Sequence, residues 1–156
     1  EEEGRAELTP RDFGILMHRV FENAATTDEI YTAIEAMTQD GVLDEKEAPR
    51  LRELVEKALA DPVTAEWFGG RWQVVRNENE IILPGSGTTR RPDRVMTDGE
   101  RAVVVDYKFG DRETARHRKQ ILEYLHLWRQ MGYTRTEGYL WYVRRGRTER
   151  VEEKED

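Results

Sequence analysis

The sequence predicts an α+β domain with a mixed central β-sheet flanked by helices, and three patterns along the chain predict it. Residues 10–62 carry apolar side chains at helical spacing. Residues 67–108 hold short apolar runs separated by Gly, Pro and Asn, which is typical of a strand meander. A long amphipathic pattern at 113–131 is then followed by a further apolar run at 138–143. This order of elements favours a single domain in which helices cover a mixed sheet.

Two helices are expected near the start of the chain. Thr9 and Pro10 predict the beginning of the first helix, because Pro is favoured in the first helical turn. The second helix is expected over about 28–37, with Thr27 or Asp28 as its cap. The apolar stripe of the first helix comprises Phe13, Leu16, Met17, Val20, Phe21 and Ala24.

A third helix is expected before the chain changes character. Asp44–Glu47 resembles a capping box, so a helix is expected from there through Leu59, with Pro62 as its stop. Trp67-Phe68-Gly69-Gly70 then marks the passage from a helical part, about 10–62, to a sheet-containing core, about 67–145.

The core is expected to contain several short strands. Asp98-Gly99 predicts a tight hairpin turn, and Pro84-Gly85-Ser86-Gly87 predicts a turn before the preceding strand. Ala102–Val105 is apolar at every position, so its strand is expected to be covered on both faces. The charged residues at the end of the chain are expected to be frayed. The expected strands are 72–75, 81–83, 90–97, 101–108 and 138–143.

Composition limits the class of protein. The 156 residues fit one domain, and 37% of them are hydrophobic. Cysteine is absent, which excludes disulfides, thiolate zinc sites and cysteine-held iron–sulfur clusters, so no such cluster is expected. No apolar run approaches the roughly 20 residues of a membrane span. A cytoplasmic protein without a membrane partner is expected, and the opening Glu1-Glu2-Glu3-Gly4 favours a fragment of a larger protein.

Charge is distributed unevenly along the chain. The net charge of −7 would be unusual for a DNA-binding protein. Residues 1–84 hold 9 Lys/Arg and 19 Asp/Glu, whereas residues 85–147 hold 14 Lys/Arg and 8 Asp/Glu. The positive segment is therefore the one in which an anionic partner is expected, although a solvated helical surface would show the same alternation.

The positive segment also contains a group of residues suited to metal chemistry. Asp106 and Lys108 share one face of a strand end, and Tyr107 points to the other face. If Asp98-Gly99 is the hairpin turn, Asp93 lies near Asp106 at the same end of the neighbouring strand. Two converging carboxylates form an oxygen-rich site suited to Mg²⁺ or Mn²⁺, whereas a salt-bridged strand end is the structural alternative.

The order Pro92-Asp93, hairpin, Asp106-Tyr107-Lys108 resembles the PD-(D/E)XK nuclease superfamily. Gln120-Ile121-Leu122-Glu123-Tyr124 is similar to the QxxxY element of its RecB/AddA-like branch, and His18 stands where that branch carries a helical His. The resemblance extends over residues 12–143 and implies a restriction-endonuclease-like core.

The resemblance implies roles for particular residues. His18, Asp93, Asp106 and the backbone carbonyl of Tyr107 would hold the metal, and Lys108 would be the catalytic lysine. Gln120 and Tyr124 are one helical turn apart, and they would support the site and contact the DNA backbone. A further Glu of the family would correspond to Glu78 or Glu80.

Other polar residues have weaker assignments. Gly14, one turn before His18, would leave room for a ligand. His117 and His126 are expected at the surface, and Trp141 and Tyr142 are expected in the core. Candidate phosphate contacts are Arg90, Arg91, Arg94, Arg112, Arg116, Arg118 and Lys119.

The resemblance implies a Mg²⁺-dependent exodeoxyribonuclease domain that acts on single-stranded DNA or duplex ends in DNA-end processing and recombinational repair. The segment 129–143 looks like the C-terminal end of a UvrD/Rep-type helicase that carries such a nuclease. No phosphate-binding Gly-rich Lys loop occurs, so a helicase motor would lie elsewhere in the full-length chain or in a partner. The alternatives are a non-catalytic DNA-binding scaffold and a stand-alone nuclease of the same superfamily.

Overall fold

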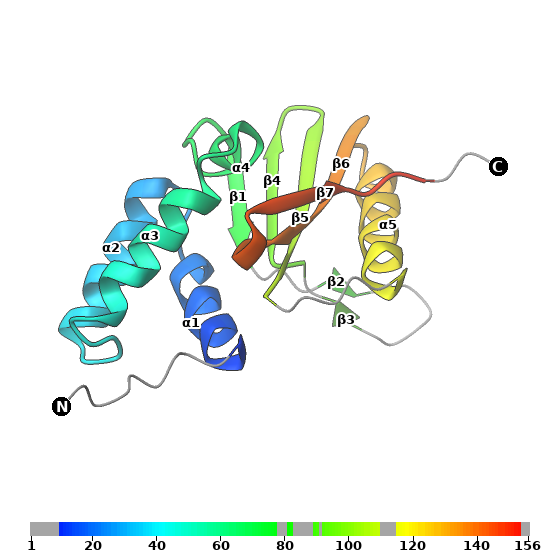
Figure 1. Cartoon of the computed structure of the whole chain (residues 1–156). Coiled ribbons are helices and arrows are strands. Elements are labelled where there is room, and N and C mark those ends of the chain that lie inside the picture. Colours follow the sequence, from blue (N-terminus) through cyan, green and yellow to red (C-terminus); the bar gives the residue numbers. More distant parts are fainter. Residues whose placement is uncertain (1–9, 78–80, 83–88, 91, 110–114, 154–156) are drawn as a thin grey trace.

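The computed structural model describes residues 10–77, 81–82, 89–90, 92–109 and 115–153 of the chain. A mixed five-stranded sheet stands between a group of helices on one side and a single helix on the other (Figure 1). This arrangement confirms the predicted fold class. None of the described helices is long and apolar enough to cross a membrane.

The helical part contains four helices, one more than predicted. They are α1 (Pro10–Glu22), α2 (Thr27–Gln39), α3 (Glu47–Ala58) and α4 (Pro62–Trp67). The cap of α2 is Thr26, whose hydroxyl accepts the N–H of Glu29, so the predicted cap at residue 27 or 28 was wrong. Pro62 does not simply stop α3, because it is also the first residue of α4.

The predicted capping box before α3 is confirmed. The Asp44 carboxylate accepts the N–H of Glu47 at 2.7 Å, and the Glu47 carboxylate accepts the N–H of Asp44 at 3.3 Å. These bonds place two acidic groups at the positive end of the helix dipole, where negative charge is stabilised.

The sheet has the strand order β1-β4-β5-β6-β7. The strands β1 (Val74–Asn77), β4 (Arg94–Asp98) and β5 (Arg101–Lys108) pair antiparallel in succession. β5 pairs parallel with β6 (Arg135–Tyr142), and the crossover between them contains α5 (Ala115–Gln130). β6 pairs antiparallel with β7 (Arg147–Arg150).

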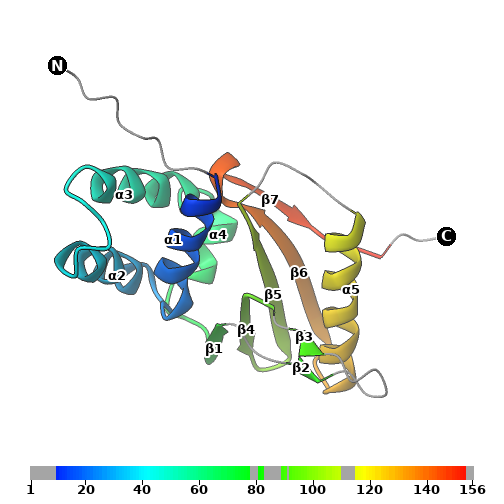
Figure 2. The same cartoon turned by 90° about the horizontal axis from the view of Figure 1, so that it is seen from below.

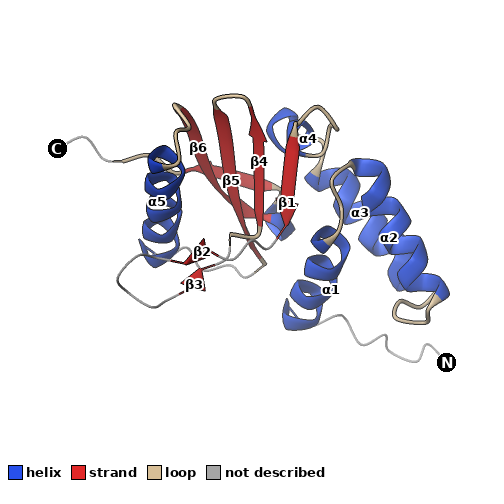
Figure 3. Ribbon diagram, turned by 180° about the vertical axis from the view of Figure 1, so that it is seen from behind, coloured by secondary structure: helices blue, strands red, loops and turns tan. Residues whose placement is uncertain are grey.

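Two strand predictions were wrong. The predicted strand 90–97 is divided: β3 (Thr89–Arg90) pairs with β2 (Ile81–Ile82) in a separate ribbon, and β4 begins at Arg94. The ribbon lies beyond the end of the sheet at which β4 starts (Figures 1 and 3). The chain end expected to fray instead forms β7 on the sheet. The predicted turn 84–87 lies outside the described residues.

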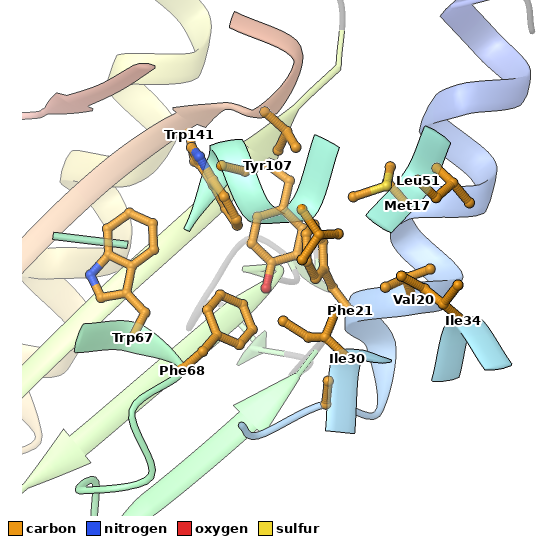
Figure 4. Packing of buried hydrophobic residues seen from close by; sticks show 14 of the residues in the cluster. Met17, Val20, Phe21, Ile30, Ile34, Leu51, Trp67, Phe68, Tyr107 and Trp141 are labelled. Atoms are coloured by element: carbon orange, nitrogen blue, oxygen red, sulfur yellow. The ribbon is translucent and has the colours of Figure 1, made fainter. Parts of the chain in front are cut away.

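β5 is covered on both faces, as predicted. Val103 and Val105 belong to the core that the sheet forms with α1–α4, and Ala102 and Val104 belong to the core beneath α5. The helix-side core contains a cluster of aromatic rings in tilted and edge-on contact, from α1, the end of α4, β5 and β6, shown with their neighbours in Figure 4: Phe21, Trp67, Phe68, Tyr107 and Trp141. The predicted core positions Trp141 and Tyr142 are confirmed as buried.

Gly138 sets the distance between α5 and β6. A Cβ at this position would stand 2.3 Å from Ile121 Cγ2 and 3.1 Å from Leu125 Cδ1. Only a residue without a side chain lets the helix lie so close to the strand, and the core beneath α5 is filled for that reason.

Arg94 joins the helical part to the sheet. Its side chain is completely buried, and its guanidinium donates to the carbonyl oxygens of Ala24 at 2.6 Å, Ala25 at 2.8 Å and Trp67 at 2.7 Å. The same group lies 3.9 Å from the ring centroid of Phe68. These carbonyls follow α1 and end α4, so one cation satisfies the ends of two helices.

We expect Arg94→Ala to lower the free energy of unfolding by about 3–5 kcal/mol, because three buried carbonyls lose their donor. Urea denaturation followed by circular dichroism measures the loss. Arg71→Ala is the matched control, since Arg71 is exposed. A loss below about 1 kcal/mol in Arg94→Ala would show that these hydrogen bonds do not hold the two parts together.

Candidate active site

The β4–β5 hairpin brings two carboxylates together. The register pairs Arg94 with Val105, so Asp93, one residue before β4, lies beside Asp106. The N–H of Asp93 donates to Asp106 Oδ1 at 3.1 Å, and the N–H of Tyr107 donates to Asp93 Oδ2 at 2.7 Å. Each carboxylate is therefore held by the backbone of the neighbouring strand, and the predicted juxtaposition is present.

Asp106 is an acid in an apolar setting. Only 5% of the residue is exposed, and this burial raises the pKa of its carboxyl group. The positive charge of Lys108, the N–H of Asp93 and His18 oppose that shift. The ionised carboxylate thus depends on nearby cations, so its surroundings favour binding of positive charge.

Lys108 and Tyr107 lie on opposite faces of β5. Asp106 and Lys108 continue the row of Ala102 and Val104 toward α5, whereas Tyr107 belongs to the helix-side core. Burial raises the pKa of the Tyr107 hydroxyl, which keeps it a neutral core group. The predicted division of faces is confirmed.

His18 reaches the carboxylates from α1. Its Nδ1 lies 3.8 Å from Asp93 Oδ1. Its ring packs against Phe109, with the centroids 4.9 Å apart, and lies 5.9 Å from the ring of Tyr107. Phe109 also fills the space beside Gly14, because a Cβ on Gly14 would stand 3.4 Å from it. The room expected for a ligand there holds an aromatic side chain, and sequence reasoning missed Phe109.

The donor set fits a divalent cation by its chemistry. Two carboxylates and an imidazole are the ligand types that Mg²⁺, Mn²⁺ and similar ions accept. Among the residues that the structure describes, no three His, Cys, Asp or Glu side chains already stand in a ligating arrangement. Asp93 and Asp106 each spend an oxygen on a backbone N–H, so binding would draw on their remaining lone pairs.

Gln120 and Tyr124 lie on α5, which packs on the Asp106 side of the sheet. Tyr124 is 3% exposed and belongs to the core beneath that helix, and Gln120 is half-buried one turn closer to the start of α5. No hydrogen bond within the described part of the chain joins Gln120 to the carboxylates. Their supporting roles stay predictions, and Glu78 and Glu80 lie outside the described residues.

The structure corrects several surface assignments. Arg94 is buried and cannot contact phosphate, and Arg118 pairs with Glu149. His117, expected at the surface, is half-buried. Its burial, and then the positive charge of nearby Lys108, lowers the pKa of its imidazole. His126 is exposed, as expected. Arg116 and Lys119 remain exposed candidates at the start of α5, whereas Arg91, Arg112 and the side chain of Arg90 lie outside the described residues.

A family model described as the PD-(D/E)XK nuclease superfamily matches residues 1–156, which is the whole chain. No curated protein matches it significantly.

We expect Asp106→Asn to raise the free energy of unfolding at neutral pH in the presence of EDTA. Asn retains the acceptor for the N–H of Asp93 and removes a buried charge. Because burial raises the pKa of the Asp106 carboxyl, the folded state favours the neutral form. The stability that this preference gives the wild type is present below the unfolded pKa of about 3.9 and is lost as pH rises through the folded value.

Urea denaturation at neutral and acidic pH measures this difference. The gain should shrink as pH falls below about 4, where the wild-type carboxyl is protonated in both states. Asp98→Asn, at an exposed position of the hairpin, is the matched control and should show no gain. A destabilised Asp106→Asn at neutral pH would contradict the account of a strained carboxylate.

Proposed function

The chain belongs to the PD-(D/E)XK nuclease superfamily. On that premise we propose that it is a metal-dependent deoxyribonuclease whose active site contains Asp93, Asp106 and Lys108. Membership implies a nuclease, and a nuclease binds nucleic acid. The observation that carries the proposal is the mutual bonding of Asp93 and Asp106 at a strand end beside Lys108. A salt-bridged strand end would not need a second, backbone-held carboxylate.

The proposed metal ligands are His18, Asp93, Asp106 and the carbonyl oxygen of Tyr107, and Mg²⁺ or Mn²⁺ fits that set. A divalent cation bound there supplies Lewis acidity to the scissile phosphate and makes water a better nucleophile. The chain's contribution is to fix the positions of the carboxylates, since the backbone N–H groups of Asp93 and Tyr107 restrict their rotation.

Lys108 serves the phosphate in this proposal. Its ammonium group shares a face with Asp106 and favours the ionised state of that carboxylate. Negative charge grows on the phosphoryl oxygens as water attacks phosphorus in line, and a nearby ammonium stabilises that charge more in the transition state than in the substrate. Gln120 and Tyr124, on the adjoining helix, are proposed to support the site and contact the DNA backbone.

The assignment of the chain to one branch of the superfamily rests on resemblance. His18 on α1 and the Gln120–Tyr124 pair on α5 favour a single RecB/AddA-like nuclease domain. We propose that residues 1–156 form such a domain, attached to a UvrD/Rep-type helicase in DNA-end processing and recombinational repair. Exonucleolytic cleavage that leaves a 5′-phosphate and a cytoplasmic location belong to the same proposal. A stand-alone nuclease of the superfamily is the alternative.

We expect the chain to cleave end-labelled linear DNA with Mg²⁺ or Mn²⁺ and to lose that activity in EDTA. Lys108→Ala should lower the rate by about 10²–10³-fold, because it removes one electrostatic contact to the transition state. Asp106→Ala should abolish turnover, because it removes a proposed metal ligand. Gel electrophoresis of single-stranded and duplex substrates measures both.

Lys46→Ala is the matched control. Lys46 is exposed and lies directly before α3, in the helical part of the chain, whereas the carboxylates belong to the β4–β5 hairpin. Cleavage that persists in EDTA, or in Asp106→Ala, would place the activity elsewhere. Wild-type protein that binds DNA but never cuts it would favour the scaffold alternative.

A further inference from the structure

The face of the sheet that carries Asp106 is only partly covered. Figures 2 and 3 show α5 over the side of the sheet that contains β6, while β1 and β4 have no helix above them on that face. Val74 and Arg76 of β1 point to this open side, because Val75 packs in the core on the other side and the side chains of a strand alternate.

A cavity of about 290 Å³ lies on this open face. Val74, Arg76, Val95 and Thr97 line it from the sheet, and Trp128 and Tyr133 line it from the end of α5 and the segment after it. We call this hollow the β1–α5 groove. Its volume is at the lower end of the range for small-molecule sites and suits one or a few nucleotides rather than a duplex.

The groove continues from the candidate active site along two elements. Asp93, Val95 and Thr97 alternate along the start of β4, so the groove begins about 7 Å from Asp93 along the strand. Gln120, Tyr124 and Trp128 follow one another at four-residue spacing on α5. These two rows lead from the carboxylates to the groove on the same side of the sheet.

The lining of the groove is chemically unlike the rest of the chain. The protein has a net charge of −7, yet no Asp or Glu of the described residues lines this hollow. Arg76 is exposed and makes no ion pair with any other residue that the structure describes. Within the described part of the chain, a phosphate could therefore approach Arg76 without meeting a competing carboxylate.

Aromatic and apolar groups complete the lining. Trp128, which is only 6% exposed, and the half-buried Tyr133 line the hollow beside Val74, which is 38% exposed, and Met131, which is 61% exposed. Aromatic faces next to a cationic side chain are typical of sites that stack the bases of single strands. An apolar protein segment could pack on the same surface, but it would make no contact that uses the positive charge of Arg76.

We propose that the β1–α5 groove binds single-stranded DNA beside the cleavage site, with a base against Tyr133 and a phosphate at Arg76. This inference rests on the proposed nuclease function, since it assigns the groove to the strand that is cut. It names a substrate class, single strands, and a direction in which that strand leaves the carboxylates along β4.

Binding is measured with Lys108→Ala protein in Mg²⁺, which keeps the proposed metal ligands and slows cleavage, over times too short for the probe to be cut. The probe is a fluorescein-labelled oligothymidylate of about 16 nucleotides, the upper end of single-strand site sizes. We expect Arg76→Gln in this background to weaken binding and to lower the slope of log K against log salt by about 0.7, the value for one phosphate contact on a single strand.

Tyr133→Ala should weaken binding about 5-fold or more, because it removes a stacked base. Tyr133→Leu keeps an apolar side chain in the groove, so an equal loss there excludes simple unfolding, which thermal melting checks. Arg50→Gln is the matched control, since Arg50 is exposed on α3, and its salt slope should equal that of the parent.

Two results would overturn the inference. One is binding by Arg76→Gln and Tyr133→Leu within about twofold of the parent, which would leave the groove to a protein segment. The other is a parent that binds duplex but not the oligothymidylate. Cleavage by the wild-type protein is assayed in parallel. If the wild type cleaves DNA and either result is found, the groove proposal is rejected and the nuclease proposal stands. If binding depends on the groove residues but the wild type never cleaves DNA, the nuclease proposal is rejected and the single-strand binding site stands.

Discussion

The buried guanidinium of Arg94 is the constraint on which the arrangement of this domain depends. A cation without exposure is costly unless its hydrogen bonds are made, and here the partners are backbone carbonyls after α1 and at the end of α4. Because Asp93 precedes Arg94, the bonds that fix the guanidinium also fix the start of β4. The same bonds hold the end of α1, the helix that carries His18. The hydrogen bonds of Arg94 therefore position two proposed ligands, His18 on α1 and Asp93 directly before β4.

The site itself costs stability. Asp106 lies at the end of an apolar strand, where burial opposes its charge, and the backbone N–H of Asp93 with the charges of Lys108 and His18 offsets only part of that cost. A neutral Asn would accept the N–H of Asp93 without a buried charge. A carboxylate at this position, bonded to the backbone N–H of a second acidic residue, supports the proposed cation site at Asp93 and Asp106. The open half of the same sheet face then offers that site a place for the strand next to the scissile bond.

Much of the fold could be predicted from sequence because local patterns determine it. The both-face apolar run at 102–105 indicated a central strand, and Asp98-Gly99 indicated a hairpin. Its turn lies one residue later than predicted, at Gly99-Glu100, because Asp98 belongs to β4 and pairs with Arg101. Gly99 has a φ of +58°, which a two-residue hairpin turn requires. The face shared by Asp106 and Lys108 followed from strand alternation alone. The two converging carboxylates alone predicted a metal site at Asp93 and Asp106. The other ligands, the catalytic lysine and the roles of Gln120 and Tyr124 came from resemblance, and all of these assignments stay predictions.

The remainder depends on contacts that one-dimensional patterns do not contain. The short helix α4 was missed because its Pro62 satisfies both a stop and a start signal. β7 is charged at every position except Thr148, and it is a strand because β6 offers it hydrogen bonds. Arg94 looked like a phosphate contact, since sequence shows charge but not burial. Phe109 and the half-buried His117 had no periodic signal, although both lie next to the proposed site.

The central claim is that Asp93, Asp106 and His18 together form a divalent-cation site, and calorimetric titration with Mn²⁺ tests it most directly. The account predicts saturable heat in the wild-type chain, its loss in Asp106→Ala, and its retention in Asp98→Ala, where an exposed carboxylate of the same hairpin is removed. Wild-type protein that binds no Mn²⁺, or Asp106→Ala that binds it as wild type does, would contradict the claim.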